Sequence, residues 1–303
     1  MPRPFRFGVT EAHAPSRTAW ATIARRVEEL GYATLLIPDR MNLGSLAATP
    51  ALAVAASVTT SLRIGSYVFC NGYRHPVLLA REAATLDLLS DGRFEPGLGT
   101  GVSASDFQQM GIPFGSARAR LDQLTETLQI LKRLFTEETV SFSGKYYTIT
   151  DMQGCPRPAQ KPHPPILVAG AGERALKLAA REANIIAIGS KITAQGVDPT
   201  DAPLEQKVAW IKEAAGDRFA DLELCLPIFD LEITDSGTTL SSQPAWSIPS
   251  RPLTTEQAVA HLLELRERYG ISYLQVSVGQ VENFAPVVAQ LTGKLTRKVD
   301  QYE

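Results

Sequence analysis

The chain has few cysteines, few histidines and no excess of positive charge. Its three cysteines are widely spaced in 303 residues, which argues against a disulfide framework and against a cysteine zinc site. A formal net charge of −2 argues against a nucleic-acid partner, because such proteins normally carry a basic surface. No apolar run approaches the length that crosses a bilayer, and residues 1–15 lack the regions of a signal peptide. We therefore expect a cytoplasmic protein with no membrane or nucleic-acid partner.

Several catalytic signatures are also absent. The four histidines are scattered, with no His-Glu-x-x-His pattern or acidic cluster beside them, so no metal site is expected. The sequence contains no Gly-x-Ser-x-Gly nucleophile elbow, and no glycine run matches Gly-x-Gly-x-x-Gly or the phosphate loop. The remaining candidate groups are mostly backbone, hydroxyl and apolar groups, which suit an organic cofactor that carries the chemistry.

Residues 63–105 contain the most informative pattern. An apolar strand (63–69) precedes a helix that begins at Pro76, and a second strand runs into the glycine run 97–101 (GLGTG). Parallel strands need such a crossover, so this stretch predicts a βαβ unit. The glycine run either lets a ligand approach the backbone closely or forms a tight turn, and both interpretations stay open.

The same alternation of strand and helix recurs along the chain. Unbroken apolar runs such as 33–37 indicate strands that are buried on both faces of a parallel sheet. Thr49 and Pro50 predict the cap and first turn of one helix, and a capping box at Thr254 and Gln257 opens another. Further strands are expected at 5–9, 166–169, 185–188, 222–229 and 273–278, and further helices at 18–30, 117–135, 204–214 and 255–269. Eight such strands predict an α/β fold, a single (β/α)8 TIM barrel domain over residues 1–303.

Two insertions interrupt this pattern, after the fourth and the seventh strand. The first covers about residues 102–165 and holds a helix, a hairpin around 140–149 and a proline-rich segment (151–165) that we expect to be an ordered crossing or a lid. The second covers about residues 230–253. Pro96 lies inside the fourth strand and lacks the N–H that a central strand donates, so we expect a local irregularity there.

In such barrels the functional residues lie on the loops that follow the strands. Here these loops carry Glu11, His13, Asp39, Arg40, Asn71, Tyr73, His75 and Thr100. The segment Gly170-Ala171-Gly172 joins a strand to the start of a helix, where free N–H groups and the helix dipole make a natural phosphate cradle. A close-packed turn is the alternative interpretation of these small residues.

Motifs in a fixed order resemble those of the bacterial luciferase-like monooxygenase family. They are residues 74–76 (RHP), 80–87 (AREAATLD), 90–94 (SDGRF), 97–101 (GLGTG) and the stretch 162–183. Within the family, the sequence is similar to the branch of coenzyme F420-dependent oxidoreductases, including residues 269–273 and the apolar helix around 284–291.

The resemblance implies a barrel that holds a deazaflavin or flavin ring, of coenzyme F420 or alternatively of FMN, at the carboxyl ends of its strands. It also implies a bulge with a non-proline cis peptide within residues 66–68, and loops at 100–101 and 170–172 that bind the ribityl chain and the phosphate. Family members commonly form homodimers through the helices that here are 51–58 and 78–89, although plain barrel packing also explains these apolar helices. The expected cofactor-binding residues are Asp39, Ser66, Tyr67, Val68, Thr100, Gly101, Gly170, Ala171 and Gly172.

Two departures from the family pattern bear on the reaction. Where the family commonly shows Asp-His after the second strand, this chain has Asp39-Arg40, and an arginine cannot exchange a proton at neutral pH. Where sugar-phosphate dehydrogenases of the family place a glutamate after the glycine run, this chain has Val102. Both changes argue against alcohol oxidation with a histidine base. The expected catalytic residues are Arg40, Glu11 and His75, and the expected substrate-binding residues are Asn71, Tyr73 and His13.

The leading hypothesis is therefore an oxidoreductase that transfers a hydride between coenzyme F420 and a small organic substrate, most simply by reducing an activated double bond. A separate reductase or dehydrogenase would supply the reduced cofactor. One alternative is an FMN-dependent monooxygenase that uses oxygen. Others are a non-enzymatic flavin-binding protein and a cofactor-free barrel that binds a sugar phosphate. The sequence does not identify the substrate.

Overall fold

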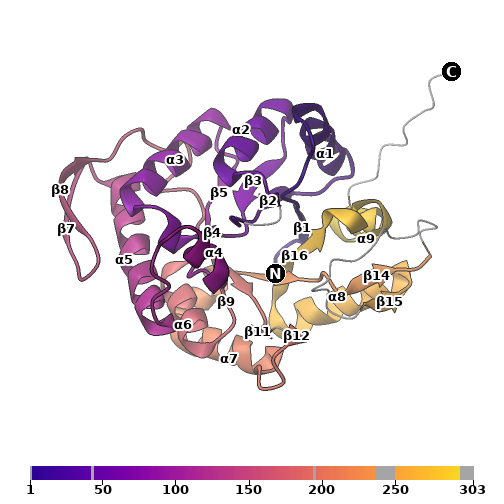
Figure 1. The fold of residues 1–303 in the computed structure, drawn as a ribbon. Coiled ribbons are helices and arrows are strands. Elements are labelled where there is room, and N and C mark those ends of the chain that lie inside the picture. Colours follow the sequence, from indigo (N-terminus) through magenta and orange to yellow (C-terminus); the bar gives the residue numbers. More distant parts are fainter. Residues whose placement is uncertain (1, 42–43, 194–195, 236–249, 294–303) are drawn as a thin grey trace.

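Parallel strands form a barrel that is surrounded by helices (Figure 1). The computed structural model describes residues 2–41, 44–193, 196–235 and 250–293. The strands of the barrel are β1 (Arg6–Thr10), β2 (Thr34–Ile37), β3 (Arg63–Ser66), β4 (Phe69–Cys70), β5 (Phe94–Glu95), β6 (Gly97–Gly99), β9 (Leu167–Gly170), β10 (Ile185–Ile188), β13 (Glu223–Pro227) and β16 (Ile271–Ser277). The helices are α1 (Arg17–Glu29), α2 (Ala48–Val58), α3 (Pro76–Leu89), α4 (Ala104–Gln109), α5 (Ala117–Thr136), α6 (Glu173–Glu182), α7 (Leu204–Ala215), α8 (Thr255–Tyr269) and α9 (Val281–Thr292).

The sheet closes on itself, and two of its strands are each interrupted once. β3 pairs with β5, and β4 pairs with β6. From β6 the parallel pairing continues through β9, β10, β13, β16, β1 and β2 back to β3. When β3 with β4 and β5 with β6 are each counted as one strand, the ten strands of the sheet become eight in a closed ring. The predicted (β/α)8 barrel is confirmed.

Both interruptions lie side by side in the third and fourth strands. Pro96 separates β5 from β6, as its missing N–H predicted. Opposite it, the peptide bond between Tyr67 and Val68 is cis, so the cis bond expected within residues 66–68 is present. The strand predicted at 63–69 is therefore two shorter strands with a bulge between them.

The glycine run of β6 makes room for this bulge. A Cβ on Gly97 would lie 2.1 Å from the carbonyl oxygen of Ser66, and a Cβ on Gly99 would lie 2.6 Å from Cγ2 of Val68. The hydroxyl of Ser66 bridges the gap, because it accepts a hydrogen bond from the Gly97 N–H (2.9 Å) and donates one to the Gly97 carbonyl (2.8 Å). The two glycines therefore serve the packing of two strands, which neither sequence interpretation had considered.

The core has two parts. The larger part lies between the strands and the surrounding helices, as expected for strands that are buried on both faces. The smaller part fills the barrel interior and includes Leu36, Leu167, Ala187 and Cys225, with Tyr67 and Val68 packed against it.

Most predicted helices lie where the sequence placed them, but the start of α2 differs. α2 begins at Ala48, and its N-cap Ala47 makes no side-chain capping bond. Thr49 is therefore not the cap. Its hydroxyl instead donates a hydrogen bond to Glu82 of α3 (3.1 Å), which shows that a contact between helices uses this side chain. The capping box at Thr254 and Gln257 is present.

The first insertion contains α4, which the sequence analysis missed, then α5 and the hairpin of β7 (Thr139–Ser143) and β8 (Thr148–Gln153). The proline-rich segment follows. Gln160 in this segment donates hydrogen bonds to Asp87 (2.6 Å) and to the Phe94 carbonyl (2.8 Å), and accepts one from Arg63 (3.0 Å). Since Arg63 begins β3 and Phe94 begins β5, this segment crosses the amino-terminal ends of the strands. It is an ordered crossing and not a lid over the opposite end.

The second insertion contributes β14 (Leu231–Ile233) and β15 (Arg251–Leu253), which pair in parallel. The middle of the predicted segment, residues 236–249, lies outside the described residues. A short hairpin of β11 (Ile192–Thr193) and β12 (Gly196–Val197) follows β10. Among the described residues, no helix is both long and apolar enough to span a membrane.

Candidate active site at the carboxyl ends of the strands

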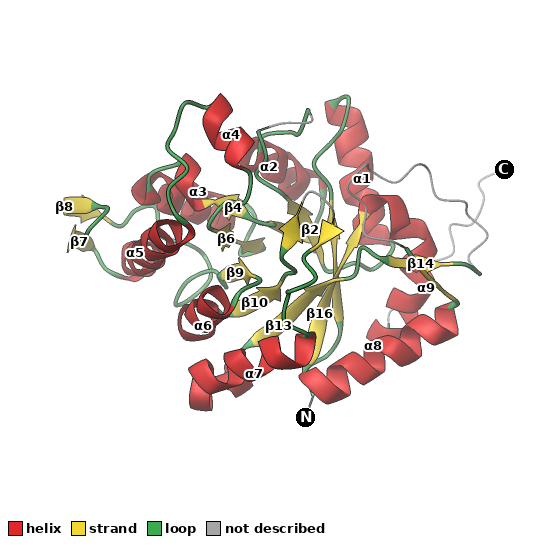
Figure 2. Cartoon of the chain, turned by 60° about the horizontal axis from the view of Figure 1, so that its bottom comes forward, coloured by secondary structure: helices red, strands yellow, loops and turns green. Residues whose placement is uncertain are grey.

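The loops that follow the strands gather at one end of the barrel. Figure 2 shows α4 beyond the strands at one end and the N terminus at the opposite end. Functional residues of such barrels lie at the carboxyl ends of the strands. All six residues predicted for catalysis or substrate binding follow β1, β2 or β4 at this end, namely Arg40, Glu11, His75, Asn71, Tyr73 and His13.

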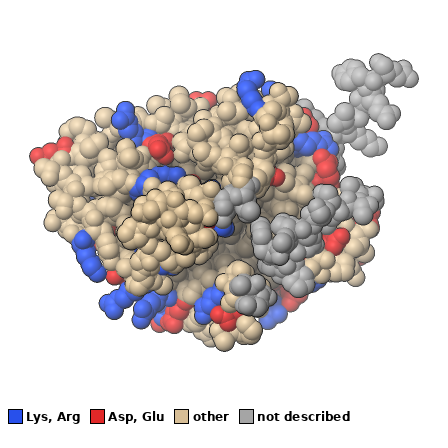
Figure 3. Space-filling view, viewed as in Figure 1, with Lys and Arg blue, Asp and Glu red and all other residues tan. Residues whose placement is uncertain are grey.

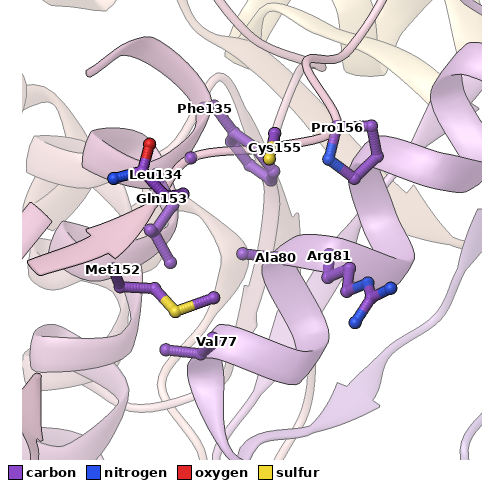
Figure 4. Close-up of a pocket in the computed structure, with 10 residues that line it drawn as sticks. Val77, Ala80, Arg81, Leu134, Phe135, Met152, Gln153, Cys155 and Pro156 are labelled. Atoms are coloured by element: carbon purple, nitrogen blue, oxygen red, sulfur yellow. The ribbon is translucent and has the colours of Figure 1, made fainter. Parts of the chain in front are cut away.

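Two hollows lie away from this end. A small cavity of about 10 Å³ lies in the helical layer between α3, α5 and the end of β8, and its lining includes Val77, Phe135 and Cys155 (Figure 4). A larger, open hollow of about 400 Å³ lies at the amino-terminal ends of the strands, where Arg6 and Glu95 pair with each other. None of the predicted catalytic or substrate-binding residues lines either hollow, so the strand ends and not the hollows define the candidate site.

The carboxylate of Asp106 is the centre of the polar contacts at the carboxyl end. It is fully buried and accepts hydrogen bonds from Ser103 Oγ (2.6 Å), Arg40 Nε (3.0 Å) and Tyr73 OH (3.3 Å). Burial alone would raise the pKa of Asp106, but hydrogen bonds from Ser103, Arg40 and the Met41 N–H outweigh burial and hold that pKa below its usual value. Asp106 therefore carries a negative charge at neutral pH.

This network joins two of the predicted residues, Arg40 and Tyr73, through Asp106, which the sequence analysis missed. Ser103 is the N-cap of α4, because its hydroxyl oxygen accepts the Asp106 N–H (3.2 Å). The spacing Ser-x-x-Asp is a helix-start signature, and this signal could have found Asp106.

Asp39 is buried and fixes the loop that follows β4. Its Oδ2 accepts a hydrogen bond from the Cys70 N–H (3.1 Å), and its Oδ1 accepts one from Arg74 (3.2 Å). Arg74 also lies over the Phe69 ring, with 4.7 Å between the guanidinium carbon and the ring centroid. These contacts give Asp39 a structural role, and its predicted contact with a cofactor stays a prediction.

Asn71 directly follows this anchored strand and is buried. Both polar atoms of its carboxamide lack a hydrogen-bond partner within the described part of the chain. A buried amide in this state costs free energy unless a ligand or water satisfies it. The carboxamide therefore suits the polar edge of a bound molecule.

The other three predicted side chains make local contacts. Glu11 Oε1 accepts a hydrogen bond from the His13 N–H (2.7 Å) and lies 3.2 Å from His13 Nδ1. His75 is exposed and caps α3, because its Nδ1 accepts the Val77 N–H (3.3 Å), and its ring packs edge-on against Tyr147. None of these contacts includes Arg40, so they do not join Glu11 or His75 to the network around Asp106. The catalytic roles predicted for Glu11 and His75 stay predictions.

The bulge places Tyr67 and Val68 at the barrel interior, beneath these loops. Burial raises the pKa of Tyr67 well above its usual value, so its phenol stays protonated at neutral pH. Thr100 and Gly101 directly follow β6, and Gly101 has a φ of +79°. A Cβ on Gly101 would lie 2.6 Å from Cys70 Sγ, so both close packing and backbone conformation require glycine there.

Close packing explains the first residue of the segment 170–172, and its predicted role as a phosphate cradle stays a prediction. A Cβ on Gly170 would lie 2.8 Å from the Cβ of Ala175, so close packing of β9 against α6 requires this glycine. Ala171 is half-buried, and Gly172 is the N-cap of α6 with open space where a Cβ would lie. Since the first N–H groups of a helix have no partner within it, this end of α6 suits an anionic group. No cluster of metal-binding side chains occurs in the part of the chain that the structure describes.

Comparison with known proteins places this geometry in a family. The model of the luciferase-like monooxygenase family matches residues 4–223. The chain belongs to this family. The luciferase-like chain is 32% identical over 217 residues to F420-dependent hydroxymycolic acid dehydrogenase of Mycobacterium tuberculosis, a match that covers 69% of this chain and 58% of the relative. It is also 32% identical over 179 residues to F420-dependent glucose-6-phosphate dehydrogenase of Microbacterium testaceum, covering 57% and 51%.

The match therefore spans little more than half the length of these two curated relatives. Among solved structures, the luciferase-like barrel is similar to the coenzyme F420-dependent tetrahydromethanopterin reductase from Methanopyrus kandleri. The TM-score is 0.76 at 18% identity, and the similarity covers 95% of this chain and 97% of the reductase. At this identity the similarity establishes the fold alone.

Proposed function

We propose that the chain is an oxidoreductase that binds coenzyme F420 and transfers a hydride between it and a small organic substrate, reducing an activated double bond. Support for the cofactor comes from the two curated relatives, both of which are named F420-dependent. Support for the direction of transfer comes from Arg40, because it stands after β2 where the family commonly has a histidine, and an arginine cannot exchange a proton at neutral pH.

The residues at the carboxyl end fit such a cofactor. Tyr67 and Val68 offer an apolar surface for a flat ring, and the unpaired carboxamide of Asn71 offers a donor and an acceptor to the polar edge of that ring. The open first turn of α6 at Gly172 suits the phosphate. When bound, the deazaflavin supplies an obligate hydride carrier that is poorly suited to oxygen activation.

The observation that carries the proposal is the ion pair between Arg40 and Asp106 (3.0 Å). Arg40 is half-exposed and uses its Nε to donate a hydrogen bond to the buried carboxylate. The ion pair holds the guanidinium in one position, and an arginine side chain does not act as a general acid or base. Such a group binds and polarises an electron-poor carbonyl or similar acceptor, and it orients this acceptor for reaction.

Fluorescence titration of the cofactor-free protein with coenzyme F420 and with FMN tests the cofactor. We expect F420 to bind at least about tenfold more tightly than FMN. Arg40→Gln is expected to leave the F420 affinity unchanged while lowering the kcat/KM for enone reduction by roughly 10²-fold, since one transition-state hydrogen-bond donor is lost. Arg118→Gln, an exposed change at the start of α5, is the matched control.

An FMN-dependent monooxygenase is the second candidate, because the family description itself names monooxygenases. Tight binding of FMN with weak binding of F420, together with oxygen uptake in reduced FMN, would contradict the F420 proposal. Cofactor binding without turnover of any acceptor would indicate a non-enzymatic flavin-binding protein instead. Binding of phosphate esters without affinity for either cofactor would indicate a sugar-phosphate barrel.

Two further proposals concern partners. We infer that a separate reductase or dehydrogenase supplies reduced F420, and that the chain forms a homodimer through α2 and α3. Exposed Leu78, Leu88 and Leu89 on α3 support the dimer, because apolar side chains on an outer helix suit a subunit interface. Sedimentation velocity of the wild type and of Leu89→Glu tests the dimer, and a monomeric mass for the wild type would contradict it.

A further inference from the structure

The segment of residues 102–116 at the candidate site is almost free of charge. Its one charged residue is Asp106, which is buried. Exposed apolar side chains occur there instead, with exposed fractions of 84% for Val102, 39% for Met110 and 37% for Phe114. Met41, which follows Arg40, is 42% exposed. We refer to Met41, Val102, Met110 and Phe114 as the apolar lip.

The apolar lip adjoins the site that the loops form. Val102 directly follows the glycine run of β6, and the Met41 N–H donates a hydrogen bond to Asp106 (3.4 Å), which also binds Arg40. Figure 3 shows an uncharged, raised surface over α4 beside a hollow in the middle of this face. The lip and the polar groups of the site are therefore parts of one continuous surface.

Aromatic contacts hold the lip against the barrel. The Phe107 ring lies 5.1 Å from the Tyr73 ring and 5.0 Å from the Phe114 ring, measured between centroids. The guanidinium carbon of Arg120 lies 3.8 Å from the centroid of Phe114. Phe107 and Arg120 both contact the Phe114 ring. These contacts hold Phe114 in place while it stays partly exposed, as a preorganised binding surface requires.

The buried and half-buried cations at this end offer little to an anionic substrate. Arg40 pairs with Asp106, Arg74 with Asp39 (3.1 Å), and Lys207 with Asp201 (2.5 Å). Arg120 faces no carboxylate within the described residues, but it lies over Phe114 and donates to the Gly115 carbonyl (2.5 Å). Three of these four cations are thus already paired with carboxylates, and the fourth, Arg120, packs its guanidinium against an aromatic ring, while apolar surface remains exposed.

We propose that the apolar lip binds the hydrocarbon part of an uncharged amphiphilic substrate. The polar group of that substrate would lie near Arg40 and Asn71, and its chain would extend over Val102, Met110 and Phe114. Ile192 and Val197, which follow β10, are further exposed apolar side chains. This inference rests on the proposed function, because it names the substrate class of the same site.

Calorimetric titration with a homologous series of methyl ketones, from 2-butanone to 2-decanone, tests the inference with and without saturating F420. Full burial of one methylene contributes about 0.8 kcal/mol, or roughly a fourfold gain in affinity. We expect the association constant to rise about twofold to fourfold with each added methylene. This readout needs binding only and no turnover.

Variants locate the binding surface. Val102→Ser, at the most exposed lip position, and Phe114→Ser are each expected to reduce the gain in affinity per methylene, and so to weaken binding of 2-decanone more than binding of 2-butanone. Val102→Ser keeps the test valid if Phe114→Ser unfolds α4. Leu263→Gln is the control, because Leu263 is equally apolar and 40% exposed but lies on α8; it is expected to change nothing.

An affinity that does not increase with chain length in the wild type would overturn the inference, as would tighter binding of glucose 6-phosphate than of any ketone. Co-sedimentation with neutral phosphatidylcholine vesicles without any chain-length effect would also overturn it. If F420 fails to bind while the chain-length effect persists, the proposed function is wrong and the lip still binds apolar chains. If F420 binds and the ketone affinities stay level, the proposed function stands and the lip inference fails.

Discussion

At the scale of single residues, Asp106 holds the candidate site together. Its carboxylate is fully buried and accepts hydrogen bonds from Arg40, Tyr73 and Ser103. Asp106→Asn would replace one acceptor oxygen by a donor and leave Arg40 without its carboxylate. We expect the free energy of unfolding to fall by about 1–3 kcal/mol, measured by urea denaturation, and α4 to become more susceptible to proteolysis.

The pH dependence of this loss follows from the pKa of Asp106, which the protein holds below its usual value. A depressed pKa means that the carboxylate contributes its full stability above the unfolded pKa of about 3.9 and loses this contribution as the pH falls through the folded value. The difference between wild type and Asp106→Asn should therefore shrink in acid. Asp217→Asn, at an exposed position, is the control, and equal losses for the two variants at pH 7 would refute the role of Asp106.

The sequence alone predicted part of this site. Arg40 was recognised because a charge at the end of a buried strand needs a partner, but the partner came from a helix of six residues, which is too short for periodicity to reveal. His75 illustrates the opposite case. It was a candidate because it lies on a loop at the carboxyl ends of the strands, and the structure shows its ring nitrogen capping α3, while its catalytic role stays a prediction.

At the scale of elements, the fit between the two interrupted strands can be tested with a pair of substitutions. A Cβ on Gly99 would lie 2.6 Å from Cγ2 of Val68, and its next neighbour is another atom of the same side chain. Gly99→Ala is therefore expected to destabilise the protein by about 1–3 kcal/mol through overpacking. Adding Val68→Ala removes the clashing methyl group and should restore part of this loss in a urea-denaturation cycle.

Gly97→Ala is the matched control for this cycle. There the Cβ would meet the backbone carbonyl oxygen of Ser66 at 2.1 Å, and no shortening of Val68 can remove a backbone atom. We expect no rescue of Gly97→Ala by Val68→Ala. Rescue of both alanine variants, or of neither, would contradict the contact geometry of the bulge.

Elements with strong local signals were the ones that the sequence predicted well. The capping box at Thr254 and the left-handed Gly270 both mark α8 in the sequence and in the structure. The break between β3 and β4 has no signal of its own in the residue pattern, and only the family resemblance predicted it; in the structure it lies beside the break at Pro96 in the neighbouring strand. The start of α2 was misplaced since Thr49, a good cap by composition, binds Glu82 of another helix.

At the scale of the whole molecule, a charged cluster links four strands at the amino-terminal end of the barrel. Glu95 of β5 binds Arg6 of β1 (2.6 Å) and Arg63 of β3, and Arg6 also binds Glu223 of β13 (2.7 Å). In the ring, β16 separates β13 from β1, and β2 separates β1 from β3. The cluster therefore joins strands that are not all neighbours. The alternation of strands and helices predicted the ring itself, but it could not predict which of its inward side chains would meet.

Glu95 is the member of this cluster whose loss should cost most. It is almost completely buried, whereas Arg6 and Arg63 keep some exposure. Glu95→Gln leaves two guanidinium groups with a single carboxylate, that of Glu223, and breaking a buried pair from one side costs about 3–5 kcal/mol. Glu282→Gln breaks an exposed arginine–glutamate pair with Arg26 and is expected to cost less than about 1 kcal/mol. Urea denaturation at pH 7 measures both.

The pH dependence of the free energy of unfolding distinguishes a loss of the Glu95 charge from a loss of packing alone. Burial alone would raise the pKa of Glu95, but the charges of Arg6 and Arg63 outweigh burial and lower it. The ionised carboxylate therefore stabilises the fold fully above the unfolded pKa of about 4.3, and this contribution disappears as the pH falls through the folded pKa. Wild type should lose stability steeply in that range, and Glu95→Gln should lose less. Parallel pH profiles for the two proteins would mean that the charge of Glu95 does not hold the strands of the barrel together.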